Sequence, residues 1–249
     1  MKAPYYIVSD NHFCMDESKF EQERRTKLFN IFEKIKQTGG TLIIGGDFFD
    51  YWFEYDEVIP KGYENILDSF CEMSQNNIDI HYVLGNHDYW DFGYLSKHCN
   101  VKTHNGDLVI KHNDNNILIT HGDGLLKNDY GYRFMKKIIR SSIFIKLYKA
   151  FPPSFTIKIA NKTSQISSRY NHHDDYVKQI KKEILLYAKK KWKENFNMVL
   201  VGHYHQTGSI NEQNNSLTFL GDWISKFTVT KIDDNGIWQG DWKEFLDLS

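Results

Sequence analysis

Short apolar runs rich in β-branched or aromatic residues recur along the chain, and polar residues and glycine follow each of them closely. Runs of four or five such residues, bounded by turn signals, predict buried strands. Helix-like segments at Glu21–Gln37 and Tyr63–Gln75 separate the first three runs. This alternation predicts parallel strands joined by helical crossovers, which is an α/β architecture. The five predicted strands are Tyr5–Val8, Thr41–Ile44, Ile80–Leu84, Ile117–Thr120 and Met198–Val201.

The pattern changes after the fourth strand. Residues 124 to about 194 have helical periodicity, and Pro152-Pro153 is expected to separate two of the helices. The segment Thr207–Trp242 alternates and has turn signals at Asn214-Asn215 and Asn235-Gly236, which predicts a closing antiparallel meander. No linker divides the chain. We therefore predict one domain over residues 1–249, with a helical cap inserted at about 124–194.

Composition limits the class of protein. A chain of 249 residues with 41% hydrophobic content can bury the core of one large α/β domain. Its 31 basic and 32 acidic residues give no overall sign of a polyanionic partner. Cys14, Cys71 and Cys99 lack a CxxC spacing, so we expect reduced thiols in a cytoplasmic protein. The first apolar stretch is too short for a signal peptide, and no run approaches the roughly 18–20 residues that span a bilayer.

Each predicted strand is followed by residues with oxygen or nitrogen ligands for a metal. In open α/β sheets, sites form at the carboxyl ends of the strands, so these five loops are expected to meet in one crevice. A single DxH or HxH pair is weak evidence, whereas five such motifs in order favour a metal site strongly. Without thiolates the ligand set suits Mn, Fe or Zn. The candidate ligands are Asp10, His12, Asp47, Asn86, His121, His203 and His205.

Read in order, the motifs SDNH, GGDFFD, GNHD, HGD and GHYH resemble those of the calcineurin-like metallophosphoesterase family. The resemblance implies a four-layer αββα fold and two divalent metal ions, with manganese the first expectation. By the family's motif, the first metal is held by Asp10, His12, Asp47 and His205. The second is held by Asp47, Asn86, His121 and His203, so that Asp47 bridges the two.

Two further residues of these motifs have expected roles. Two cations about 3.5–4 Å apart can clamp phosphoryl oxygens and lower the pKa of a water that attacks phosphorus. His87, beside Asn86, is placed by the motif to meet the leaving group or the developing phosphoryl charge. Asp50 resembles the family's partner that orients this histidine; the alternative is an ordinary turn acid.

The predicted cap has an unusual charge distribution. Residues 124–172 contain ten basic residues and one acid, Asp129, and the rest of the molecule is correspondingly acidic. Apolar residues alternate with the basic ones at helical spacing, which suits an anionic amphiphile or an anionic membrane surface. Alternatively, the apolar residues only seat the cap on the core. No nucleic-acid-binding module is visible, so no nucleic-acid partner is expected. The basic residues are Lys127, Arg133, Lys136, Lys137, Arg140, Lys146, Lys149, Lys158, Lys162 and Arg169.

A closer resemblance covers most of the chain. The segments GGDFFDYWFEY, ITHGDGLLKNDYGYRFMKKI and LGDWISKFTV look like those of UDP-2,3-diacylglucosamine diphosphatases of lipid A biosynthesis. This implies hydrolysis of an acylated UDP-sugar to UMP and 2,3-diacylglucosamine 1-phosphate, by a protein peripheral to the inner face of the inner membrane. Asp129 and Tyr132 correspond to residues that contact the sugar, and Asn86 is expected to face the substrate. Asp129 could instead cap the following helix.

Other functions remain open at this stage. Better-known diphosphatases of this type have arginine where this chain has His87, which keeps a general phosphodiesterase or nuclease acting on nucleotides as an alternative. A catalytically dead scaffold is disfavoured, because all seven predicted ligands are present.

Overall fold

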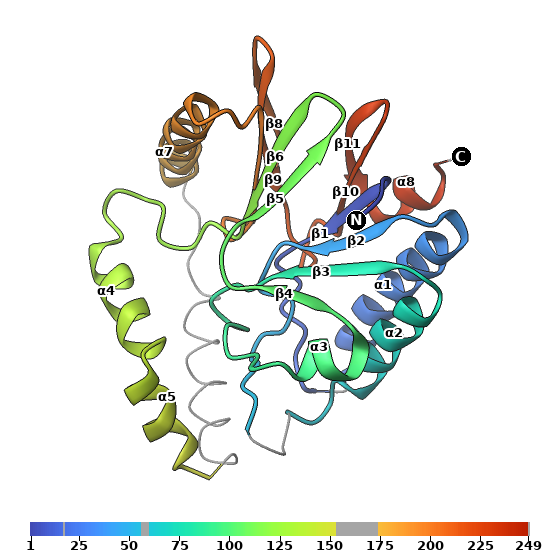
Figure 1. Ribbon diagram of the computed structural model, residues 1–249, viewed down its shortest axis with the longest axis vertical. Coiled ribbons are helices and arrows are strands. Elements are labelled where there is room, and N and C mark those ends of the chain that lie inside the picture. The colour runs from blue at the N-terminus through green and yellow to red at the C-terminus, as the bar shows by residue number, and fades with distance from the viewer. Residues whose placement is uncertain (17, 56–59, 153–173, 249) are drawn as a thin grey trace.

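The computed structural model describes residues 1–16, 18–55, 60–152 and 174–248. Two mixed β-sheets form its centre (Figure 1). The first sheet has the order β11-β10-β1-β2-β3-β4, and the second has the order β5-β6-β7-β9-β8. In the first sheet the strands are β1 (Tyr5–Val8), β2 (Thr41–Ile44), β3 (Asp79–Val83), β4 (Lys102–His104), β10 (Thr228–Asp233) and β11 (Gly236–Asp241). In the second they are β5 (Leu108–His112), β6 (Asn115–Thr120), β7 (Met198–Val201), β8 (Thr207–Glu212) and β9 (Asn215–Leu220).

Three apolar layers hold the sheets and helices together. Along β1, Tyr6 and Val8 point into the layer between the first sheet and its helices, whereas Tyr5 and Ile7 point into the layer between the sheets. Because both faces of such a strand are buried, its sequence is apolar throughout. The first sheet is covered by α1 (Lys19–Thr38), α2 (Glu64–Gln75), α3 (Tyr94–Cys99) and α8 (Trp242–Leu246). The second is covered by α7 (Asp174–Lys193), so the predicted four-layer αββα fold is confirmed.

The closing meander is the part of the predicted fold that is wrong. Two hairpins form, but β8 and β9 belong to the second sheet, whereas β10 and β11 belong to the first. The alternating pattern predicts a hairpin, but it contains no information about which sheet each hairpin joins. Strands β4 and β5 were not predicted, because β4 has three residues of which none is apolar, and the apolar run of β5 has only three residues.

Helices α4 (Tyr130–Ile139) and α5 (Ser142–Lys149) follow one another along the side of the molecule opposite α1 and α2 (Figure 1). Helix α7, which the predicted cap also includes, instead packs on the second sheet through Ile180, Ile184 and Ala188. Pro153 and the basic residues Lys158, Lys162 and Arg169 lie outside the described residues. Among the helices that are described, none is both long and apolar enough to cross a membrane.

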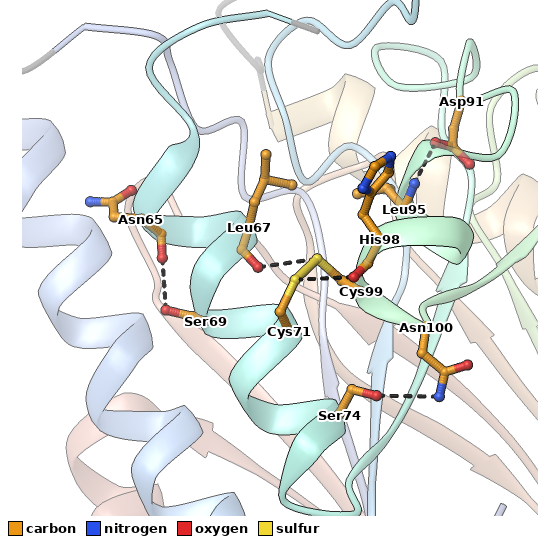
Figure 2. Close-up of a disulfide and its surroundings, with 10 residues drawn as sticks. All are labelled: Asn65, Leu67, Ser69, Cys71, Ser74, Asp91, Leu95, His98, Cys99 and Asn100. Carbon is orange, nitrogen blue, oxygen red and sulfur yellow. Dashed lines mark hydrogen bonds between the residues drawn. A yellow bond between two sulfur atoms is a disulfide. The ribbon is translucent and has the colours of Figure 1, made fainter. Parts of the chain in front are cut away.

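The predicted reduced state of the cysteines is wrong for two of them. Cys71 on α2 and Cys99 at the end of α3 form a disulfide, with their Cα atoms 4.2 Å apart (Figure 2). The two helices pack side by side, and this contact between residues 28 positions apart leaves no signature in cysteine spacing. Cys14 is free and half-buried, and burial raises the pKa of its thiol to about 12.

The disulfide predicts a labelling result. Denatured protein that has not been reduced should take up one alkyl group per chain, at Cys14, and reduction should raise this number to three. Mass spectrometry of the intact protein counts the groups. Three groups without reduction would show that Cys71 and Cys99 are thiols.

A histidine pair with one buried member lies at the edge of the first sheet. His81 Nδ1 and His104 Nε2 are 2.9 Å apart, and the His81 side chain is buried. Burial lowers the pKa of His81 to about 4, and the neighbouring His104 and Lys102 act in the same direction. The folded protein therefore binds a proton at His81 less readily than the unfolded chain does.

This pair predicts a loss of stability in acid. The contribution of His81 is fully present above a pH of about 6.5 and is lost as the pH falls from there toward the folded value of about 4. Between pH 8 and pH 5 the free energy of unfolding should fall by on the order of 1–2 kcal/mol through this group. Chemical denaturation at both pH values should show a smaller fall for His81→Gln than for the unchanged protein. Equal falls would contradict the assignment.

Candidate metal centre

The five motif loops converge at one place in the structure. They follow β1, β2 and β3 of the first sheet and β6 and β7 of the second, and all of these strands present their carboxyl ends to the same region. Three groups of side chains have potential ligand atoms within 4.8 Å of one another. The groups are Asp10 with His12 and His205, His12 with Asp47 and His87, and Asp47 with His121 and His203.

Asp47 lies at the centre of these groups. Its Oδ1 accepts hydrogen bonds from the backbone N–H groups of Asn86 at 2.8 Å and His87 at 2.9 Å. Its Oδ2 lies 3.2 Å from His121 Nε2 and 3.8 Å from His12 Nε2. Burial pushes the pKa of Asp47 upward, but His121 and His87 outweigh it, so the pKa lies well below its usual range. Asp47 is therefore a carboxylate shared between two histidine clusters.

Asp10 is fixed from two directions. The Ser9 hydroxyl donates to its Oδ2 at 2.6 Å, and the His203 backbone N–H lies 2.9 Å from both of its carboxylate oxygens. Its Oδ1 is 3.6 Å from His205 Nε2. Burial raises the pKa of Asp10 to about 6. A divalent cation would offset this cost of burying the charge.

The histidines of these groups direct ring nitrogens toward the carboxylates. His121 Nδ1 lies 3.0 Å from the Gly45 carbonyl oxygen, so Nδ1–H donates there and Nε2 faces Asp47 and the Asn86 side chain. Burial lowers the pKa of His121, but Asp47 outweighs it and raises this pKa to about 10, so a metal ion at Nε2 would replace a proton. His12 Nε2 is buried and has no hydrogen-bond partner among the described residues. Burial lowers the pKa of His203 to about 4 and that of His205 to about 3, which keeps both rings neutral. An unpartnered ring nitrogen, neutral imidazoles and buried carboxylates together fit divalent metal ions.

The backbone supports the same assignment. Left-handed φ angles cost residues other than glycine of order 1–3 kcal/mol and persist where the surroundings impose them. Asparagine accepts this conformation readily. Apart from asparagine, only Gln213 and Phe227 share it with the predicted ligands among the described non-glycine residues. The predicted ligands that adopt it are Asp10, His12, Asp47, His203 and His205.

A charged group on α1 supports the first loop, and the sequence reasoning missed it. Arg24 donates to the backbone carbonyls of Asn11, His12 and Trp223, and it pairs with Glu21 Oε2 at 2.6 Å. Glu21 also pairs with Arg25 at 3.1 Å. All three charged side chains are buried. A signal was available, because they continue the apolar face of α1 at the helical spacing of Leu28, Ile31, Phe32 and Ile35.

Asp88 was also missed. Its carboxylate accepts from the backbone N–H groups of Phe48 and Gly85, both at 2.7 Å, and from the Tyr82 hydroxyl. It thereby joins the loop after β2 to the loop after β3. The fourth residue of the GNHD motif is thus a structural acid that fixes the position of Asp47 relative to Asn86.

His87 and Asp50 lie together beside this centre. His87 Nδ1 is 2.7 Å from the backbone carbonyl oxygen of Asp50, and the Asp50 carboxylate is 3.7 Å from the same nitrogen and 3.5 Å from His12 Nδ1. The backbone carbonyl therefore makes the short orienting contact, and the carboxylate lies between the two histidines. The catalytic role of this pair stays a prediction.

Of the two predicted sugar contacts, Tyr132 lies at the border of the metal centre and Asp129 lies at the start of α4. The Tyr132 hydroxyl donates to Asp123 Oδ2 at 2.7 Å, and its ring centroid is 6.4 Å from that of His203, so Tyr132 borders the centre. Asp129 is the N-cap residue of α4, but its side chain makes no capping hydrogen bond. Capping therefore does not account for this acid. Contact of either residue with a substrate stays a prediction.

Residues 3–207 match the family described as calcineurin-like phosphoesterase. The chain belongs to this family. A UDP-2,3-diacylglucosamine hydrolase of Porphyromonas gingivalis is 25% identical to this calcineurin-like phosphoesterase, over 96% of this chain and 95% of the relative. A protein of the same name from Histophilus somni (strain 129Pt) is 25% identical over 95% of this chain and 98% of its own length. The solved structure of Yfce, a phosphoesterase from E. coli, is 12% identical with a TM-score of 0.48, over 97% of this chain and 94% of that chain.

Gly85 provides a test of this phosphoesterase centre. A Cβ atom at Gly85 would lie 2.1 Å from Asp47 Oδ1 and 2.5 Å from the Asp47 backbone nitrogen, so Gly85→Ala must displace this residue. We expect Mn²⁺ to bind about 10- to 100-fold more weakly, as measured by isothermal titration calorimetry.

The matched control is Gly131→Ala. A Cβ atom at Gly131 would meet nothing within 4 Å, and alanine favours the helix in which this residue lies. Its Mn²⁺ affinity should equal that of the unchanged protein. Unaltered Mn²⁺ binding by a folded Gly85→Ala variant would show that Asp47 is not a ligand.

Proposed function

We propose that this phosphoesterase hydrolyses the pyrophosphate bond of UDP-2,3-diacylglucosamine, releasing UMP and 2,3-diacylglucosamine 1-phosphate, with two divalent metal ions and manganese as the first choice. Relatives that carry this hydrolase name align with nearly the whole chain. The observation that carries the proposal beyond the family is an exposed apolar surface on the two cap helices beside the metal centre.

Both cap helices expose apolar side chains at a spacing of four residues. On α4 these are Tyr130, Phe134 and Ile138, and on α5 they are Ile143 and Leu147. Phe134 is 68% exposed and Ile143 is 74% exposed. Exposed apolar residues grouped in this way on a protein surface indicate a ligand or membrane contact. This supports a substrate with acyl chains.

The cap also stands close to the predicted metal ligands. Lys136 of α4 pairs with Asp123 at 2.6 Å, and Asp123 follows His121 by two residues. The α5 residue Tyr148 packs against Phe53, with ring centroids 4.7 Å apart, in the loop after β2. An acylated sugar phosphate could therefore lie with its phosphates at the centre and its chains along the cap. Basic residues next to the apolar ones suit a protein at the surface of an anionic membrane, which we propose as its location, on the cytoplasmic side.

The chemistry divides between the metals and the protein. Bound divalent ions would neutralise phosphoryl oxygens and supply a water of lowered pKa as nucleophile. Asp47 holds a position shared by both ligand clusters. His87 donates Nδ1–H to the Asp50 carbonyl, so its Nε2 would need a second proton, as in the imidazolium form, to donate to a phosphoryl or leaving-group oxygen. Asn86 contributes its amide oxygen toward His121 and the metal position.

A general phosphodiesterase acting on nucleotides is the second candidate. His87 favours it, because its ring has one nitrogen left for a second phosphate, whereas the arginine of better-known diphosphatases has a fork of several N–H donors. Such an enzyme would cleave simple diesters without acyl chains.

The proposal predicts Mn²⁺-dependent release of UMP from UDP-2,3-diacylglucosamine in mixed micelles, measured by chromatography. Asp47→Ala should lower the rate at least ~100-fold, because the shared carboxylate is removed. Asp114→Asn, at an exposed turn, should leave it unchanged. Cleavage of bis(p-nitrophenyl) phosphate without any UMP release from the lipid would instead support the second candidate.

A further inference from the structure

A cavity of about 170 Å³ adjoins the metal centre on the side of His121. It lies where the end of β3, the end of β6 and the cap helix α4 meet, and Thr120 and His121 form part of its wall. Of the residues that line this cavity, only His121 is a predicted metal ligand, and neither predicted sugar contact is among them. The cap side of the wall is provided by Lys136 and Arg140, one turn apart on α4.

Both cations are held in place rather than extended into solvent. Arg140 donates to the Gly85 carbonyl oxygen at 3.1 Å, and its guanidinium carbon lies 3.7 Å from the ring centroid of Tyr89. Gly85 and Tyr89 flank the Asn86-His87 pair in sequence. Lys136 contacts both the carboxylate of Asp123, at 2.6 Å, and its backbone carbonyl, at 3.3 Å. These contacts hold both side chains against the loops that carry the predicted ligands.

The charges on this wall are not balanced within the cavity. Asp123 is the buried acid, and both Lys136 at 2.6 Å and Arg140 at 3.7 Å share its Oδ2. The same oxygen also accepts from the Tyr132 hydroxyl. The second acid of the wall, Asp107, is exposed, so solvent screens its charge. Two cations on one buried carboxylate leave a net positive wall, and a guanidinium held in this way is suited to bind a phosphoryl group.

The position of Lys136 and Arg140 indicates which phosphoryl group of a substrate they could bind. Asp123 follows His121 by two residues, so the cations lie next to the metal centre and not at a separate surface. In a diphosphate, the second phosphorus is one bridging oxygen away from the first. An anion held at the metals therefore brings the other phosphoryl group of a diphosphate next to this wall.

We propose that Lys136 and Arg140 bind the phosphoryl group of the diphosphate that the metal centre does not hold. The proposal rests on the proposed pyrophosphate hydrolysis and names the residues that select a diphosphate over a simple phosphate diester. Asp123 keeps the two cations in place before substrate binds. Since this contact is made with the bound diphosphate, its loss raises KM more than it lowers kcat.

The test compares two substrates in the Mn²⁺-loaded protein. For UDP-2,3-diacylglucosamine, Arg140→Gln and Lys136→Gln should each raise KM about 10- to 100-fold with kcat within about threefold, and Arg140→Lys should recover part of the loss. For bis(p-nitrophenyl) phosphate, which has one phosphorus, both constants should stay within about threefold. Lys111→Gln, at an exposed lysine of β5, is the control and should leave both substrates unaffected.

A binding measurement provides a readout apart from turnover. Methylenediphosphonate, whose P–C–P bridge is not hydrolysed, should bind the unchanged Mn²⁺-loaded protein more tightly than inorganic phosphate in calorimetry, and Arg140→Gln should remove this difference. The proposal would be overturned if Arg140→Gln and Lys136→Gln changed KM equally for both substrates, or changed it for neither. If the unchanged protein releases no UMP, only the proposed function is contradicted, because the preference for the diphosphonate over phosphate is measured without turnover.

Discussion

The structure depends on a buried carboxylate, Asp47, that joins its two sheets. Asp47 lies in the loop after β2 of the first sheet, and its Oδ1 accepts from two backbone N–H groups of the loop after β3. Its Oδ2 faces His121, which ends a strand of the second sheet. Burying this charge is costly unless partners surround it, and here both sheets supply them. The apolar layer between the sheets therefore has to set their separation accurately for the carboxylate to be satisfied.

The need to bring ligands from both sheets to Asp47 explains why residues near the centre have left-handed φ angles and buried charges. The ligand loops take left-handed φ angles because each must turn sharply at the end of a buried strand and still direct its side chain inward. Arg24 and Asp88 then hold the backbone of these loops from behind. Local strain at Asp10 and His12 is thus compensated by buried charged groups that have no other evident use in the core.

Much of this arrangement could be predicted from sequence, for a physical reason. Strands buried on both faces are read as apolar runs, and the residues after them must lie at the carboxyl edge of the sheet, so Asp10 and His203 could be expected near one another. The disulfide between Cys71 and Cys99 and the division of the two C-terminal hairpins between sheets could not be predicted in this way. Both depend on which helices and sheets pack together, and neither leaves a periodic signal. The buried charges of α1 lie between these cases, since their helical spacing is visible although their partners are not.

Helix α4 has two different sides, one exposed and apolar and the other basic and directed toward the metal centre. Along α4, Tyr130, Phe134 and Ile138 are exposed, whereas Lys136 and Arg140 turn toward the predicted ligands. One helix thus presents an apolar side to whatever approaches the cap and a cationic side to phosphate. Because the two sides belong to one helix, the proposed substrate would have the position of its acyl chains linked to that of its phosphoryl group through the contacts of this helix with Gly85 and Asp123. The calcineurin-like core supplies the hydrolytic chemistry, and it is this two-sided helix that would restrict it to an amphiphilic diphosphate.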